Sequence, residues 1–114
     1  MKTTDITFSG DPSRAKSAIE QAVLARGYSI TWTDSWTGTA QKGSKHGFST
    51  FYKVGLSIMS GTLGQVTLRV SPLITARTNG LAFQKRTARE LLGLNQGMTQ
   101  ALAAVGDIIS SIDH

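Results

Sequence analysis

Two runs of alternating residues near the middle of the chain constrain its fold more than any other feature. In Val54–Ile58 and in Val66–Val70 every second residue is apolar, and the residues between are polar or small. A period of two indicates β-strands with one buried face. The connection Ser60–Gly64 contains two glycines and suits a hairpin turn. We expect Ile58 to pair with Val66, which places both apolar sets on one face of a sheet that needs a cover on that side.

The stretch Tyr28–Gln41 shows the same alternation on both sides of a short Thr-Asp-Ser connection. A three-residue loop over 33–35 would pair Trp32 with Trp36 on the apolar face, whereas a two-residue loop would put the two indoles on opposite faces. Each buried aromatic side chain removes about 150–250 Å² from water, which favours the three-residue loop. We therefore predict that both tryptophans belong to the core. An exposed Trp36 would instead favour a site for nucleic acid or sugar.

The N-terminal part predicts a strand followed by a helix. Residues Thr4–Ser9 alternate, and Asp11 then provides an N-cap with Pro12 at the first helical position. Apolar residues follow at helical spacing as far as Val23, and Gly27 is placed to end the helix.

Towards the C-terminus, apolar residues recur from Leu91 to Ile112 in steps of three and four, which predicts one long helix across the sheet. A coiled coil is the alternative interpretation of this stripe. Residues 71–90 are compatible with either a small extra hairpin or an irregular arm, since Pro72 should end the preceding strand.

Together these elements predict a two-layer α+β sandwich in the order β-α-β-β-β-β-α, with an antiparallel sheet of about five strands and the long C-terminal helix packed across one face. The 114 residues fit a single domain, 1–114. The order of elements is similar to that of the TATA-box-binding and helix-grip folds. No residue motif points to a family within those folds.

The sequence offers little for catalysis. It has no cysteine and two histidines, His46 in a glycine-flanked loop and His114 at the end, so we expect neither a metal nor a cofactor. No two of the carboxylates have a spacing that indicates shared acid–base work. The segment Gly38–Ser44 has the glycine spacing of a phosphate-binding loop, but a serine occupies the position that requires lysine. No apolar run is long enough to span a membrane, and we expect a cytoplasmic protein.

Charge is distributed unevenly along the chain. Residues 35–89 contain eight cations and no carboxylate, whereas the four cations and four carboxylates of residues 1–34 cancel. We expect the central cations to attract a polyanion, either nucleic acid or an acidic protein surface. A basic surface kept for solubility is the other interpretation. The candidate anion-binding residues are Lys53, Arg69, Arg77, Lys85, Arg86 and Arg89.

The face of the sheet opposite the helices is predicted to be rich in threonine and serine. Its candidate contact residues are Thr31, Thr37, Thr39, Gln41, Ser57 and Thr67. The leading hypothesis is a small binding module without catalytic activity, which uses the basic centre or this open face for an anionic partner or for self-association as a homodimer. The second is a carrier of an apolar small molecule, with room beneath the C-terminal helix at Gly38 and Ala40. The third is an enzyme whose site is dispersed along the chain.

Overall fold

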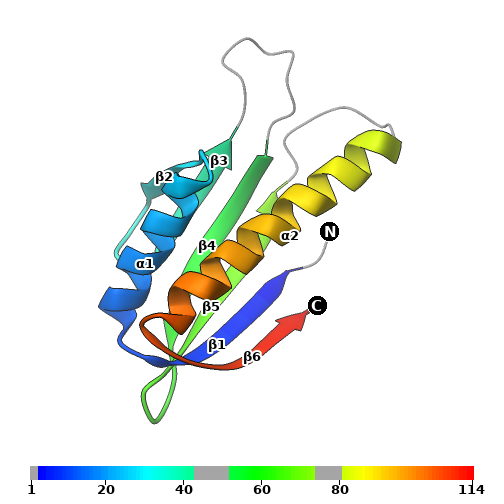
Figure 1. Cartoon of the computed structure of the whole chain (residues 1–114). Coiled ribbons are helices and arrows are strands. Elements are labelled where there is room, and N and C mark those ends of the chain that lie inside the picture. Colours follow the sequence, from blue (N-terminus) through cyan, green and yellow to red (C-terminus); the bar gives the residue numbers. More distant parts are fainter. Residues whose placement is uncertain (1–2, 43–51, 74–80) are drawn as a thin grey trace.

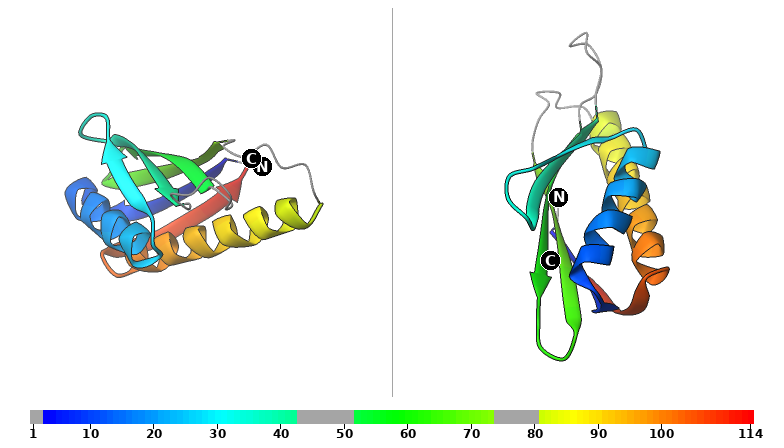
Figure 2. Two further views of the ribbon diagram at one scale, coloured as in Figure 1. Left: turned by 90° about the horizontal axis from the view of Figure 1, so that it is seen from above. Right: turned by 90° about the vertical axis from the view of Figure 1, so that its left-hand side faces the viewer.

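The computed structural model describes residues 3–42, 52–73 and 81–114, with side chains of the second helix described from Ala88 onward. Two helices cover one face of a six-stranded antiparallel sheet (Figures 1 and 2). The elements are β1 (Thr4–Gly10), α1 (Pro12–Ala25), β2 (Ser29–Trp32), β3 (Thr37–Lys42), β4 (Tyr52–Ser60), β5 (Gln65–Leu73), α2 (Leu81–Ala103) and β6 (Gly106–Asp113). Across the sheet the strands run in the order β2-β3-β4-β5-β1-β6. This is the predicted two-layer α+β sandwich, with one more strand than expected.

The core lies between the sheet and the helices. Alternate residues of the central strands point towards the helices, and both helices turn an apolar stripe towards them. The largest side chains that are fully buried there are Ile6, Phe8, Ile19, Val23, Val54, Leu56, Val66, Leu68, Leu94, Met98 and Leu102. The start of α1 is as predicted, because the Asp11 carboxylate accepts a hydrogen bond from the backbone N–H of Arg14 at 3.0 Å. Gly27 follows this helix with a φ of 87°, which glycine adopts without strain.

Both hairpins have the predicted faces but a different register. Ile58 pairs with Leu68 and not with Val66. In the other hairpin Trp32 pairs with Gly38. Both predicted loops contain an odd number of residues, as the observed loops do, but each predicted loop is centred one residue too early in the chain. Moving a loop with an odd number of residues along the chain by one position leaves each side chain on the same face of the sheet. The alternation of apolar residues therefore could not determine where the loop lies.

The first hairpin is fixed by its turn, Asp34–Trp36. The Asp34 carboxylate accepts hydrogen bonds from the backbone N–H groups of Trp36 and Thr37, both at 2.8 Å. The N–H of Thr33 donates to the carbonyl of Thr37, also at 2.8 Å. This side-chain turn places Trp36 inside the loop, so Trp36 cannot pair with Trp32 in the sheet.

The prediction that both tryptophans belong to the core is wrong for Trp36, which is 38% exposed. Trp32 packs against the core, and its indole N–H donates to the carboxylate of Glu20. The Lys16 ammonium lies 4.7 Å from the centroid of the Trp32 ring and 5.8 Å from that of Trp36. Attraction between the ammonium and the two ring faces ties the tip of this hairpin to α1.

The C-terminal helix begins and ends earlier than predicted, because α2 runs from Leu81 to Ala103 and β6 follows it. The apolar spacing of α2 continues by coincidence through Ile108 and Ile112, which belong to the strand. A bulge in β6 opposite Thr7 and Phe8 removes the clean alternation that would have revealed a strand. The two neighbouring isoleucines and two serines of β6 were the available signal, since they are poor helix formers.

Gly106 marks the point where the chain turns back against β1. A Cβ atom at this position would lie 2.1 Å from the backbone oxygen of Ser9, so no larger residue fits there. Gly97, in the middle of α2, has nothing within 4 Å of the corresponding position.

Several predictions of the sequence lie outside the described residues. These are the loop histidine His46 and residues 74–80 of the uncertain segment. The rest of that segment was predicted wrongly as a hairpin or an irregular arm, because β5 continues through Pro72 to Leu73 and α2 begins at Leu81. No helix among the described residues is both long and apolar enough to cross a membrane.

The two glycines give a matched test of the fold. Gly106→Ala is expected to lower the free energy of unfolding by about 2 kcal/mol or more, because the new methyl group collides with backbone. Gly97→Ala is expected to raise it by about 0.5–1 kcal/mol, since alanine favours a helix and nothing obstructs it. Urea denaturation of both variants measures the difference, and an equal effect at the two sites would contradict this packing.

Candidate functional site

The structure divides the predicted anion-binding residues between the two layers. Lys53, at the start of β4, and Arg69, in β5, are on the open face, because they alternate with residues of the core. Lys85, Arg86 and Arg89 belong to α2, on the other side of the sheet. The Arg89 side chain is exposed, the side chains of Lys85 and Arg86 are outside the described ones, and Arg77 lies in the segment 74–80.

Arg69 is already paired with a carboxylate of the protein itself, that of Asp5. Its Nε and Nη2 atoms donate to the two carboxylate oxygens of Asp5 at 2.9 and 3.0 Å. His114 lies 2.9 Å from the same carboxylate. The hydrogen bond from Arg69 lowers the pKa of Asp5 to about 2, and this outweighs the opposing effect of burial. The expectation that Arg69 has no compensating carboxylate is therefore wrong, since β1 brings Asp5 beside β5.

A second carboxylate, Glu90 of α2, gathers three donors from three other elements. It accepts hydrogen bonds from Arg26 Nη2 at 3.2 Å, from the hydroxyl of Tyr28 at 3.1 Å and from Lys42 Nζ at 3.4 Å. The Lys42 ammonium also lies over the Tyr28 ring, 5.6 Å from its centroid. This cluster joins the end of α1, the start of β2 and the end of β3 to α2.

The titration of the cluster follows from its burial and its charges. Burial raises the pKa of Glu90, but hydrogen bonds from Tyr28 and Arg26 and the charges of Arg26 and Lys42 outweigh it, so the net shift is downward. Burial and the neighbouring carboxylate raise the pKa of Tyr28 well above its ordinary value. At neutral pH the cluster therefore consists of a carboxylate, a neutral phenol and two cations.

Gly93 makes room for this arrangement one turn further along α2. A Cβ atom there would lie 2.3 Å from Arg26 Nη2, so the glycine allows the guanidinium to lie against the helix. Arg26 Nε is buried and has no hydrogen-bond partner among the described residues. The guanidinium therefore has a buried N–H donor that no described residue uses.

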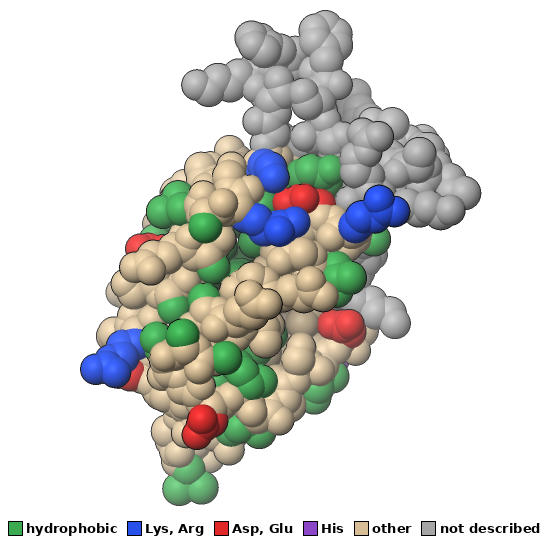
Figure 3. All heavy atoms as spheres, in the orientation of Figure 1, with side chains coloured by type: hydrophobic (Ala, Val, Ile, Leu, Met, Phe, Trp, Pro, Cys, Tyr) green, Lys and Arg blue, Asp and Glu red, His purple; other side chains and the backbone are tan. Residues whose placement is uncertain are grey.

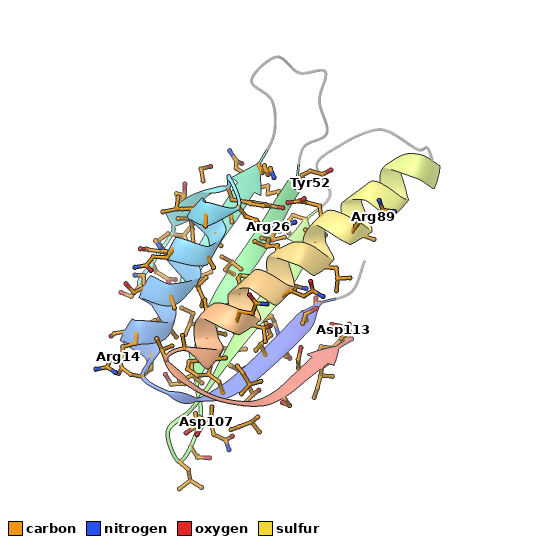
Figure 4. All side chains as sticks on the ribbon, viewed as in Figure 1. Arg14, Arg26, Tyr52, Arg89, Asp107 and Asp113 are labelled. Carbon is orange, nitrogen blue, oxygen red and sulfur yellow. The ribbon has the colours of Figure 1, made fainter. Side chains whose placement is uncertain are left out.

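We call the end of the molecule that carries Arg26, Lys42 and Arg89 the basic end. Figure 3 shows cationic side chains gathered there around an acidic one. In Figure 4, Arg26 and Arg89 lie at this end together with Tyr52, whereas Arg14 and Asp107 lie at the other end. Two of these three cations, Arg26 and Lys42, form ion pairs with Glu90, and Arg89 is exposed.

Sequence reasoning missed two members of this group. Arg26 was discounted because its charge cancelled within residues 1–34, although the end of α1 carries it to this site. Lys42 was counted among the central cations but was not selected. The sequence did contain a signal for Lys42. It follows Gly38 and Ala40 at every second position of β3, so its side chain is on the same face of the strand as theirs, the face towards the helices.

The predicted open-face residues share one side of the sheet, and no described element covers it. Three cross-strand rows contain five of the six, and the first pairs Thr31 with Thr39. The others are Thr37 with Ser57 and Arg69, and Met59 with Thr67 and Thr7. The hydroxyls of Thr7 and Thr67 are hydrogen-bonded at 2.9 Å. Gln41 lies beside Lys53 at the same end of the sheet as Lys42.

The space that we predicted for an apolar ligand is filled. A Cβ atom on Gly38 would lie 2.8 Å from the ring of Trp32, and Ala40 is fully buried in the core. A groove exists elsewhere, between α2 and the ends of β1, β5 and β6, with a volume of about 720 Å³. Its lining residues are Thr4, Pro72, Ala88, Leu91, Leu92, Asn95, Gln96, Thr99, Gln100, Ser111 and Asp113.

Within the described ranges no three of the His, Asp and Glu side chains are grouped so as to hold a metal ion.

The Asp5–Arg69 pair predicts a pH dependence of stability. The folded pKa of Asp5 is about 2, below the ordinary 3.8, so the stabilisation is complete above about pH 4 and is lost as the pH falls through 2. Asp5→Asn should therefore reduce the fall in unfolding free energy between pH 4 and pH 2, as measured by urea denaturation at each pH. Asp107→Asn, at an exposed carboxylate on β6, is the control. An equal effect of both changes would contradict the role of the pair.

Comparison with known proteins shows the fold and nothing finer. No protein-family model matches the chain, and no curated protein matches it. Among solved structures, it is similar to a chain in the crystal structure of the adenylate sensor from AMP-activated protein kinase in complex with 5-aminoimidazole-4-carboxamide 1-beta-D-ribofuranotide. The TM-score is 0.54 at 18% sequence identity, over 78% of this chain and 93% of that chain. At this identity the likeness supports a common α+β architecture.

Proposed function

We propose that this protein is a small binding module without catalytic activity and that it holds a nucleic acid at its basic end. The observation that carries the proposal is that Arg26 and Lys42, which share the carboxylate of Glu90, lie at the same end of the molecule as the exposed Arg89. Four further cations belong to neighbouring parts of the chain. Lys45 and Arg77 occur in the segments that join β3 to β4 and β5 to α2, and Lys85 and Arg86 belong to the first turns of α2.

The contact we propose is with phosphates and not with bases. The exposed indole of Trp36 belongs to the turn before β3, and the basic end lies at the far end of that strand. The six residue steps from Trp36 to Lys42 separate them by about 20 Å. Since Lys16 also covers one side of the Trp36 ring, this indole is poorly placed to stack on a base held by the cations. Binding should therefore be insensitive to sequence and sensitive to salt.

The absence of catalysis is proposed because the carboxylates are occupied within the fold. Six of the seven accept hydrogen bonds from the protein itself. Asp11 caps a helix, Asp34 fixes a turn and Glu20 holds an indole. Groups that hold the structure together are not free to move protons for a substrate. A nucleic acid partner also agrees with the cytoplasmic location that we expect.

The first test is fluorescence anisotropy of labelled RNA and DNA oligomers at about 50 and 200 mM salt. For four phosphate contacts, affinity is expected to fall about a hundredfold between these conditions. Arg89→Gln removes one contact and should reduce this fall to about fortyfold. Arg14→Gln is the matched control, because Arg14 is also an exposed cation on a helix but lies at the opposite end (Figure 4).

Absence of binding to both oligomers at the lower salt concentration would overturn the nucleic acid proposal. Equal effects of the Arg14 and Arg89 substitutions would show that net charge, and not the basic end, attracts the oligomer.

A homodimer through the open face is a second candidate. Three apolar side chains at least a third exposed, Met59, Leu73 and Ile112, occupy that face among its threonines and serines. If the face self-associates, sedimentation equilibrium should show dimers, and Thr39→Arg should dissociate them by placing a long charged group in the interface. Ser13→Arg adds the same charge to the exposed side of α1 as a control. A monomer at every concentration would contradict this candidate.

A further inference from the structure

The outer edge of the last strand, β6, pairs with no strand in the part of the chain that the structure describes. This strand is the final one of the sheet and bonds to β1 on one side. The backbone N–H of His114 donates to the carbonyl of Thr3 at 2.8 Å, and this fixes which residues face β1. Because hydrogen-bonded and free positions alternate in an antiparallel ladder, Ser110 and Ile112 bond to β1 while Ser111 and Asp113 direct their backbone groups outward. Unpaired groups of this kind accept an additional strand.

The same edge borders the groove beneath α2. In Figure 1, α2 and β6 diverge from the turn that joins them, and β1 lies between. Ser111 and Asp113 form the β6 side of this groove, and Leu92 of α2, 58% exposed, lies on the opposite wall. A strand added to β6 would therefore bring alternate side chains towards α2, where an apolar residue can contact Leu92.

The groove also contains an unsatisfied polar atom. Asn95 donates through Nδ2 to the hydroxyl of Thr4 at 3.3 Å, and Thr4 donates in turn to Asp113 at 2.7 Å. The Oδ1 atom of Asn95 is buried and accepts no hydrogen bond from a described residue. A buried acceptor without a donor is costly, so a ligand that supplies a donor after a small rotation of the amide would be favoured.

The charge of β6 and of the groove determines which kind of peptide strand can add to this edge. Asp113 is the charged side chain among the lining residues, and β6 also carries Asp107 and no lysine or arginine. From Glu90 to Ala103, α2 likewise has no cation. A second copy of β6 would bring like charges together, which is unfavourable between paired strands. A segment with lysine or arginine would be attracted.

We propose that the outer edge of β6 and the adjoining groove bind an extended peptide segment that carries lysine or arginine and adds to the sheet as a further strand. This site is separate from the basic end and independent of the function proposed for it. Backbone hydrogen bonds to Ser111 and Asp113 supply affinity, and the carboxylate of Asp113 and the side chain of Leu92 select alternating cationic and apolar residues.

The test uses a fluorescein-labelled peptide of alternating lysine and valine, with a glutamate–valine peptide for comparison. Anisotropy at low salt is expected to show binding of the lysine peptide alone. Ser111→Pro removes an outward N–H without breaking a bond to β1, and it should weaken binding about tenfold or more. Amide hydrogen exchange of Ser111 and Asp113 in the unchanged protein should slow when the peptide is bound.

A second variant keeps the test decisive if the proline disturbs folding. Leu92→Lys changes an exposed side chain on the groove wall and should also weaken binding about tenfold. Leu24→Lys, at a leucine 56% exposed on α1, is the control and should leave binding unchanged. Failure of the lysine peptide to bind, equal binding of both peptides, or equal effects of the two lysine substitutions would overturn the proposal. A dimer that Ser111→Pro dissociates would also overturn it, since a second copy would then occupy the edge.

Discussion

The rest of the structure depends on the one-sided sheet formed by β4 and β5. Leu56 and Leu68 and their neighbours at alternate positions face one side, and burying them requires both helices on that side. This requirement brings the end of α1 and the middle of α2 together over the end of β3. The cluster around Glu90 is formed where those three elements meet. The concentration of positive charge at one end is thus a consequence of how the core is covered.

Local patterns predicted the elements that local physics determines. Alternation identified β4 and β5, and the Asp11 cap identified the start of α1, because neighbouring residues decide both. Contacts between residues far apart in the sequence could not be predicted from local patterns. The pairs Asp5 with Arg69 and Lys42 with Glu90 join residues 64 and 48 positions apart, so charge summed along the chain misrepresented charge in space. The end of α2 was missed for a related reason, since β6 owes its conformation to β1 and not to its own sequence pattern.

Pairing within the fold also narrows where function can reside. Asp5 and Glu90, which sequence alone leaves available for chemistry, instead hold strands and helices together. What remains available is surface: a basic end beside α2 and an acidic strand edge at β6. The two binding sites proposed above thus have opposite charge, and each would attract a partner of the other sign.

The position of β1 has a consequence for how the chain acquires its structure. Among the described strands β1 comes first in the chain, yet it lies inside the sheet between β5 and β6. Both partners are distant in the sequence, since Thr4 pairs with Val70 of β5, 66 positions along the chain, and with Asp113 of β6, 109 positions along. Pairings between residues so far apart form slowly, since a long loop must close first. The inner place of β1 is therefore complete only when β6 has docked against it, so the sheet cannot be finished strand by strand in the order of the chain.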